Sequence, residues 1–172
     1  MKKILFFVDE NYEDLELWYP KIRLEEAGYS TVIAAALKNK EYKGKHGYPC
    51  KSEISVDDIK INELAGLVIP GGFSPDKLRR NKTVLDITAQ IFSKNKLVAF
   101  ICHAGWVPIS AKIVKGKNVT SVEAIKDDLE NAGAIWKNKA VVVDGNLISS
   151  RTPKDLPEFL KAILKWLSSK EA

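Results

Sequence analysis

The chain has 172 residues, of which 45% are hydrophobic and 28% charged, and its formal net charge at pH 7 is +5. This composition is typical of a single globular domain, here residues 1–172, and two cysteines are too few for a disulfide framework. The sequence has no apolar run of about 18 residues that would indicate a membrane span, and its amino terminus has the pattern of a strand rather than of a secretory signal. We therefore expect a cytoplasmic protein with no membrane partner.

Most of the positive charge comes from lysine, and its densest stretch is residues 38–51. Lysine makes point-charge contacts, whereas the recognition of bases and phosphates favours arginine. At the edge of a sheet, lysines more often prevent pairing with another chain than bind a polymer. We therefore expect no nucleic-acid partner and interpret this stretch as a solvated edge.

Strands and helices alternate along the predicted chain. Continuous apolar runs predict buried strands at 4–8, 31–37, 66–69 and 97–101. Helical spacing predicts helices at 14–27, from 76, at 83–92, 104–112 and 123–131, and from a cap at Thr152 onward. Pro20 is expected to kink or restart the first helix. Turn residues predict a hairpin at 141–150 and a hairpin-like excursion at 38–56.

Buried strands that alternate with helices predict a mostly parallel sheet with helices on both faces, which is a three-layer α/β/α sandwich. In such folds, ligands bind at the carboxyl ends of the strands. Three strand ends are therefore candidate sites, at residues 9–13, 70–73 and 101–105.

Cys102 follows a buried strand and precedes a predicted helix, which is the layout of a nucleophile elbow. The free N–H groups at the helix start stabilise a thiolate, and a protonated His103 beside it would lower the pKa of the thiol. The alternative is a buried core cysteine next to a solvated histidine, because free cysteine is among the most buried residue types.

The polar groups at the other two strand ends allow a functional interpretation and an ordinary structural one. Gly71 and Gly72 expose backbone N–H groups that suit an oxyanion hole, although an ordinary turn has the same sequence. The acids at 9–14 suit a helix amino terminus, and one of them facing Cys102 would interact with its thiol. The two cysteines and two histidines fit no metal-ligand spacing, and no glycine-rich nucleotide motif follows the first strand, so we expect neither metal nor cofactor.

Several short motifs lie in a fixed order along nearly the whole chain. They are Asn11-Tyr12-Glu13-Asp14-Leu15-Glu16-Leu17, Gly44-Lys45-His46-Gly47-Tyr48, Pro70-Gly71-Gly72, Ala99-Phe100-Ile101-Cys102-His103, Ile109-Ser110-Ala111, Asn131-Ala132-Gly133 and Val141-Val142-Val143-Asp144-Gly145-Asn146. Together they resemble the ThiJ/PfpI family, and within it the PfpI-like intracellular proteases, which are related to class I glutamine amidotransferases.

This resemblance implies a flavodoxin-like sandwich in which Cys102 is the nucleophile and Glu13 is the acid that contacts its sulfur. It also implies that His103 lies beside the cysteine and that the N–H groups of Gly72 and His103 form the oxyanion hole. Gly71 would line the pocket together with Trp106.

Two positions depart from the family pattern. Asp76 stands where PfpI-like proteins have a glutamate that completes a triad in a neighbouring subunit, so the resemblance implies a homodimer or a hexamer with a shorter acid. Trp106 ends a run that is usually Cys-His-Gly-Pro-Gln and is Cys102-His103-Ala104-Gly105-Trp106 here, which would narrow the pocket.

The resemblance implies a cysteine-dependent hydrolase, and two activities remain open. One is a protease or amidase, and the other is a cofactor-free glyoxalase or deglycase acting on small carbonyl compounds. Both begin with attack of a thiolate on a carbonyl and use the same oxyanion donors. A second hypothesis is a redox-sensing protein that uses oxidation of Cys102 without turnover, because an accessible thiolate oxidises readily. A flavin or nucleotide binder is suggested by the fold class alone.

Overall fold

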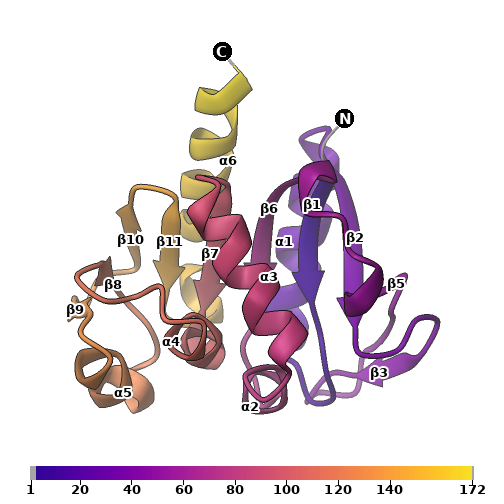
Figure 1. The fold of residues 1–172 in the computed structure, drawn as a ribbon, viewed down its shortest axis with the longest axis horizontal. Helices are drawn as coiled ribbons and strands as arrows, with labels where there is room; N and C mark the ends of the chain where they lie inside the picture. Colours follow the sequence, from indigo (N-terminus) through magenta and orange to yellow (C-terminus); the bar gives the residue numbers. More distant parts are fainter. Residues whose placement is uncertain (1–2, 172) are drawn as a thin grey trace.

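The computed structural model describes residues 3–171, which form three layers (Figure 1). The central layer is a seven-stranded sheet with the strand order β10-β11-β7-β6-β1-β2-β5. Its strands are β1 (Lys3–Phe7), β2 (Ser30–Ala35), β5 (Ile54–Ser55), β6 (Leu64–Ile69), β7 (Leu97–Ile101), β10 (Val141–Asp144) and β11 (Leu147–Ser150). All neighbouring pairs are parallel except β10 with β11. The predicted class, a mostly parallel α/β fold, is confirmed.

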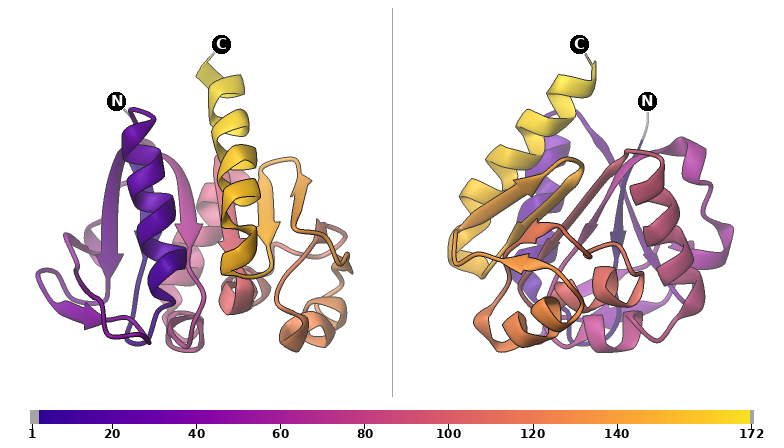
Figure 2. Two further views of the ribbon diagram at one scale, coloured as in Figure 1. Left: turned by 180° about the vertical axis from the view of Figure 1, so that it is seen from behind. Right: turned by 60° about the vertical axis from the view of Figure 1, so that its left-hand side comes forward.

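Helices cover both faces of the sheet (Figure 2). One face carries α1 (Asp14–Glu26) and α6 (Leu156–Glu171), and the other carries α2 (Ser74–Leu78), α3 (Lys82–Ser93), α4 (Trp106–Ser110) and α5 (Lys126–Asn131). Ile4 and Phe6 pack towards the first group, while Leu5 and Phe7 pack towards the second. Successive side chains of a strand point to opposite faces, so the apolar run in β1 supplies two cores at once.

The excursion after β2 forms a small sheet of its own. Strand β3 (Glu41–Lys43) pairs with β4 (Pro49–Lys51) in an antiparallel hairpin, as the turn residues indicated. The hairpin does not only protect an edge, because its turn lies against the loop that follows β1. The N–H of Asn11 donates to the carbonyl of Lys43 (2.8 Å), and the N–H of Lys45 donates to the carbonyl of Tyr12 (2.9 Å).

Several local expectations need correction. Helix α1 continues through Pro20 without restarting, because the buried residues Leu17 and Leu24 on either side of it hold the helix against the sheet and offset the lost hydrogen bond. The helix expected at 104–112 is divided into a 3-10 turn, Cys102–Gly105, and α4. Thr152 precedes a 3-10 turn, Pro153–Asp155, and makes no side-chain cap.

A few short elements complete the fold. Strands β8 (Asn118–Val119) and β9 (Ile135–Trp136), which the sequence pattern did not predict, form a separate parallel pair. Further 3-10 turns are Val56–Asp58, Ile61–Glu63 and Glu123–Ile125. Within residues 3–171, none of the helices combines the length and apolar character needed to cross a membrane.

Candidate active site

The carboxyl ends of β1, β6 and β7 meet at one edge of the sheet, at the bottom of Figure 1. Backbone hydrogen bonds join the first two ends: the N–H of Glu13 donates to the carbonyl of Gly71 (3.0 Å), and the N–H of Phe73 donates to that of Asn11 (2.8 Å). The third end carries Cys102, whose Cβ lies next to Gly71. The strand ends singled out in the sequence therefore form one site.

Cys102 has a strained backbone. Its φ angle is +62°, a left-handed conformation that costs an L-residue other than glycine about 1–2 kcal/mol. The turn brings the sulfur against the backbone N–H groups of His103 and Gly72, and both donate hydrogen bonds to it. These bonds lower the pKa of the thiol, but burial and the nearby Glu16 together raise that pKa to about 12. The residue has the geometry expected of a nucleophile elbow.

Two consecutive glycines are required beside the cysteine. A Cβ on Gly72, whose φ is +84°, would lie 2.4 Å from the carbonyl oxygen of Asn11. A Cβ on Gly71 would lie 2.5 Å from Oε2 of Glu16 and 2.8 Å from the Cβ of Cys102. Any larger residue would push these groups apart, so the glycines allow the acid, the backbone donors and the thiol to meet.

Glu16 is the acid that lies against the thiol. Its side chain is fully buried, Oε2 accepts the N–H of Gly71 at 2.7 Å, and the carboxyl interacts with Cys102. Burial raises the pKa of Glu16 to about 8, so the carboxyl is protonated at neutral pH. Oε1 has no hydrogen-bond partner in the part of the chain that the structure describes. A proton on the carboxyl makes it a hydrogen-bond donor, and the Cys102 sulfur, with which the carboxyl interacts, gains most from such a donor when it ionises.

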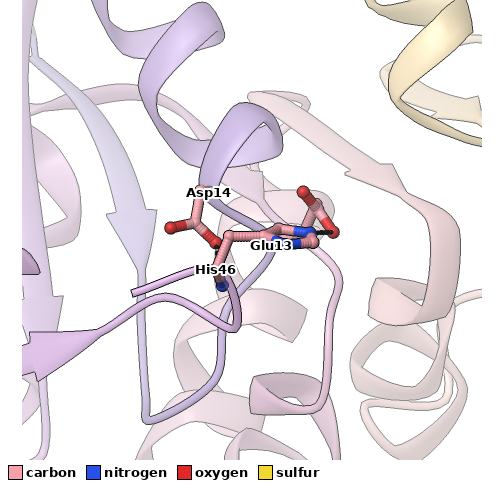
Figure 3. A group of neighbouring side chains, drawn as sticks. All are labelled: Glu13, Asp14 and His46. Atoms are coloured by element: carbon pink, nitrogen blue, oxygen red, sulfur yellow. Dashed lines mark hydrogen bonds and ion pairs between the residues drawn. The ribbon is translucent and has the colours of Figure 1, made fainter. Parts of the chain in front are cut away.

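The expectation that Glu13 contacts the sulfur is therefore wrong, since Glu16 occupies that place. Glu13 is the cap residue of α1 and its carboxylate turns towards the β3–β4 turn. Its Oε2 lies 2.7 Å from Nζ of Lys45. The same oxygen lies 3.6 Å from Nε2 of His46, and Figure 3 shows the His46 ring beside the Glu13 carboxylate. Glu16 follows three residues later, which places it about one helical turn further along α1 and beneath Gly71.

The ligand atoms of Glu13, Asp14 and His46 lie within 4.8 Å of one another (Figure 3). The carboxylate oxygens of this group already have partners. The two oxygens of Asp14 accept the backbone N–H groups of His46 and Tyr48, each at 2.9 Å, and Glu13 binds the ammonium group of Lys45. Because these contacts satisfy the carboxylates within the chain, we assign no metal to the group.

His103 faces the thiol even though the two residues are adjacent. Its Nδ1 lies 3.4 Å from the sulfur, because the left-handed turn at Cys102 brings neighbouring side chains together. Burial, with the charge of Lys45, lowers the pKa of His103, so the imidazole is neutral at neutral pH. Its ring packs against Trp106 with the centroids 5.3 Å apart, and Nε1 of Trp106 donates to Asp128 at 2.8 Å. Trp106 therefore borders the site, and its hydrogen bond to Asp128 fixes the orientation of its ring.

Asp76 lies on α2, and its exposed carboxylate accepts a hydrogen bond from Arg80 at 2.9 Å. Among residues 3–171, no hydrogen bond or ion pair joins this carboxylate to His103. Within the described residues, the structure therefore does not bring Asp76 into contact with the cysteine and histidine of its own chain.

A strained cysteine between a buried strand and a helix, with backbone donors on its sulfur, defines an α/β protein of the nucleophile-elbow class. Comparison of the sequence narrows that class. Residues 2–166 match the model of the DJ-1/PfpI family, and the chain belongs to this family. The predicted family is thereby confirmed.

Three relatives illustrate the match. A protein of Pyrococcus furiosus named deglycase PfpI is 42% identical over 165 residues, which cover 96% of this chain and 99% of the relative. A two-domain protein of Anabaena variabilis, with a DJ-1/ThiJ/PfpI-like and a ferritin-like domain, superposes with a TM-score of 0.96 at 38% identity, over 98% of this chain and 48% of that one. DJ-1beta of Drosophila melanogaster superposes with a TM-score of 0.91 at 27% identity, over 99% of this chain and 92% of that one.

The sequence interpretation missed two side chains of the site. Glu16 stands in the same motif as Glu13, and its signal was a charged residue at a position of the helix that faces apolar neighbours. Lys45 was counted among the solvated lysines, and its signal was the short turn between Gly44 and Gly47, which limits where the side chain can go.

Proposed function

We propose that the chain is a cytoplasmic, cysteine-dependent enzyme that acts as a deglycase on 2-oxoaldehydes and their adducts. Cys102 is the nucleophile, and because burial raises the pKa of its thiol to about 12, its proton passes to the neutral imidazole of His103, 3.4 Å away, as the sulfur attacks. The single observation that carries this proposal is the sulfur itself, which accepts two backbone hydrogen bonds on a strained turn beside the protonated Glu16. The deglycase names of relatives that match almost the full chain support the same reading.

Methylglyoxal serves as the simplest substrate. The sulfur attacks the aldehyde carbon, an S–C bond forms, and the carbonyl electron pair moves to oxygen, which takes a proton. The hydrogen on that carbon then leaves as a proton, its electron pair forms a C=C bond, and the ketone oxygen takes a proton, which gives an enediol. Protonation of the neighbouring carbon and loss of the proton on the first oxygen then give the thioester of lactate. Water hydrolyses the thioester to lactate and restores the thiol, so one methylglyoxal and one water give one lactate with no external oxidant.

The residues divide these steps between them. The N–H groups of Gly72 and His103 stabilise negative charge on the sulfur and on the oxygen that forms next to it. In this mechanism the protonated Glu16 donates to the sulfur once it ionises, and the neutral His103 accepts and returns protons. Trp106 limits the space beside His103, which favours a small carbonyl compound over a folded protein.

Loss of methylglyoxal and formation of lactate test the activity directly. We expect Cys102→Ala to abolish both and Cys50→Ala to leave both close to wild type, because Cys50 is buried in the hairpin region beside Tyr12. A fluorogenic peptide amide, assayed in parallel, distinguishes a protease or amidase. Wild-type rates with Cys102→Ala in both assays would exclude cysteine catalysis.

We also propose a homo-oligomer, a dimer or a hexamer, in which Asp76 approaches His103 of a neighbouring subunit. Phe73, close to Asp76 in sequence, is 69% exposed, so its ring is available to contact a second subunit. Sedimentation at micromolar concentration tests this assembly, and a monomer would exclude it. If Asp76 takes part, Asp76→Asn lowers the rate while the oligomer persists.

A second candidate function is redox sensing, favoured by a partly exposed sulfur with two backbone donors ready to bind sulfinate oxygens. Intact mass after mild peroxide treatment tests it. We expect added oxygen that is absent from Cys102→Ala, and no selective addition would exclude this function.

A further inference from the structure

Trp106 is the first residue of α4, and contacts from three other elements converge on its ring. The imidazole of His103, in the 3-10 turn, lies 5.3 Å away between centroids, and Asp128 of α5 accepts Nε1 at 2.8 Å. The third contact is a cation: the guanidinium carbon of Arg79, the cap residue after α2, lies over the ring, 5.6 Å from its centroid. An arginine at this distance is attracted to the face of an indole.

Arg79 is held along α4 by a second contact. Its Nε donates a hydrogen bond to Oγ of Ser110 at 3.0 Å. Ser110 follows Trp106 by four residues, which places the two side chains one turn apart on the same face of α4. The half-buried guanidinium group therefore spans this turn of α4 and restricts where the indole ring can lie.

The contacts that start at Arg79 end at the sulfur. The Trp106 ring packs on His103, and Nδ1 of His103 lies 3.4 Å from Sγ of Cys102. Within residues 3–171, the imidazole has no hydrogen-bond partner besides this sulfur. In one chain, packing against Trp106 is therefore what orients the imidazole, and a proton can pass to Nδ1 only if the ring faces the thiol.

We propose that Arg79 is a positioning residue for the acid–base step. It fixes the Trp106 ring, and that ring holds the His103 imidazole with Nδ1 against the sulfur. This inference rests on the proposed function in one respect, namely that His103 takes up the proton of Cys102.

Steady-state kinetics on methylglyoxal give the first test. Arg79→Met removes the guanidinium group, and we expect kcat to fall about fivefold with KM changed less than about twofold, because the orientation of His103 is lost and not a contact with the substrate. Arg79→Lys keeps a cation for the ring but loses the planar fork that binds Ser110, so its kcat should be intermediate.

Arg23→Met is the matched arginine control, because it removes only an ion pair with Glu26 on α1, and it should keep the wild-type constants. A raised KM with an unchanged kcat in Arg79→Met would show that Arg79 binds the substrate, and this result would overturn the proposal.

A double variant tests whether Arg79 acts through the indole. In the Trp106→Ala background, Arg79→Met should lower kcat no further, because the ring that transmits its effect is already gone. Losses that multiply in the double variant would overturn the proposal.

The orientation of His103 can also be observed without turnover. His46 and His103 are the two histidines of the chain, so NMR can follow both imidazoles once His46→Ala has assigned them. We expect Arg79→Met to shift the side-chain resonances of His103 and to leave those of His46 unchanged. Ser110→Ala keeps the arginine but removes its anchor, and should act in the same direction, which preserves the test if Arg79→Met does not fold.

Unchanged His103 resonances in these variants would overturn the inference and leave the proposed function in place. Resonances that shift in this way, in a protein whose wild type does not act on methylglyoxal, would sustain the inference and exclude the deglycase.

Discussion

Glu13 and Glu16 lie three residues apart at the start of α1, and their surroundings differ sharply. Glu13 forms an ion pair with Lys45 on the side of the hairpin turn, where Nε2 of His46 also lies 3.6 Å from its carboxylate. Glu16 is fully buried beneath Gly71, and the backbone N–H of Gly71 donates a hydrogen bond of 2.7 Å to its Oε2. A glutamate therefore binds the Lys45 ammonium group at position 13 and keeps its proton at position 16, because the surroundings of each carboxyl decide whether its charged form is stable.

The largest expected effect separates the two acids by activity. We expect Glu16→Leu to lower kcat/KM for methylglyoxal by about 100-fold, because it removes the hydrogen-bond donor that the proposed mechanism places beside the sulfur. Glu13→Gln should cost less than about tenfold, since it changes only the partner of Lys45. Steady-state kinetics of both variants decide the point, and equal losses would remove the distinction between them.

The pH dependence of stability sharpens the same comparison. The pKa of Glu16 is raised from 4.5 in the unfolded chain to about 8 in the folded protein, so between these values the folded state binds a proton that the unfolded state does not. The free energy of unfolding should then fall as pH rises through this window, with a slope of up to about 1.4 kcal/mol per pH unit from this group. Urea unfolding at several pH values measures it. The slope should diminish in Glu16→Gln and persist in Glu13→Gln.

A smaller effect concerns the turn on the Glu13 side. Asp14→Asn removes one of the two acceptor oxygens and places an amide NH2 group opposite a backbone N–H of His46 or Tyr48. We expect a loss of about 1–3 kcal/mol in the free energy of unfolding. Asp86→Asn, which alters an exposed ion pair with Lys82, is the control and should cost less than about 1 kcal/mol. An Asp14 variant as stable as this control would show that the turn is not clamped.

The smallest expected effect lies on the other side of the thiol. Trp106→Phe keeps an aromatic ring beside His103 and loses the hydrogen bond to Asp128. We expect kcat/KM to fall a few-fold, because the lost hydrogen bond to the Asp128 carboxylate is one contact that orients the ring. Trp106→Ala should cost more than Trp106→Phe. The reverse order would show that Trp106 obstructs the substrate and does not orient His103.

Local patterns were enough to predict most of the fold and part of the site. The apolar run before Cys102 predicted β7 with the boundaries that the structure has, and the abrupt change to a helical pattern predicted the elbow. The glycines after β6 indicated the backbone donors that now face the sulfur. Each of these features depends on neighbours in the chain, which a sequence displays directly.

The roles of the remaining side chains depend on contacts between distant segments. Nothing within the first turn of α1 distinguishes Glu13 from Glu16, because their difference arises only when Gly71 covers one and Lys45 approaches the other. Lys45 itself reads as one of many solvated lysines until Asp14 draws its turn onto α1. The sequence by itself determined which strand ends carry the candidate site residues, with Cys102 and His103 at the central one. Tertiary structure alone decided which acid lies against the thiol and which acid pairs with Lys45, since burial and charge pairing are properties of the assembled fold.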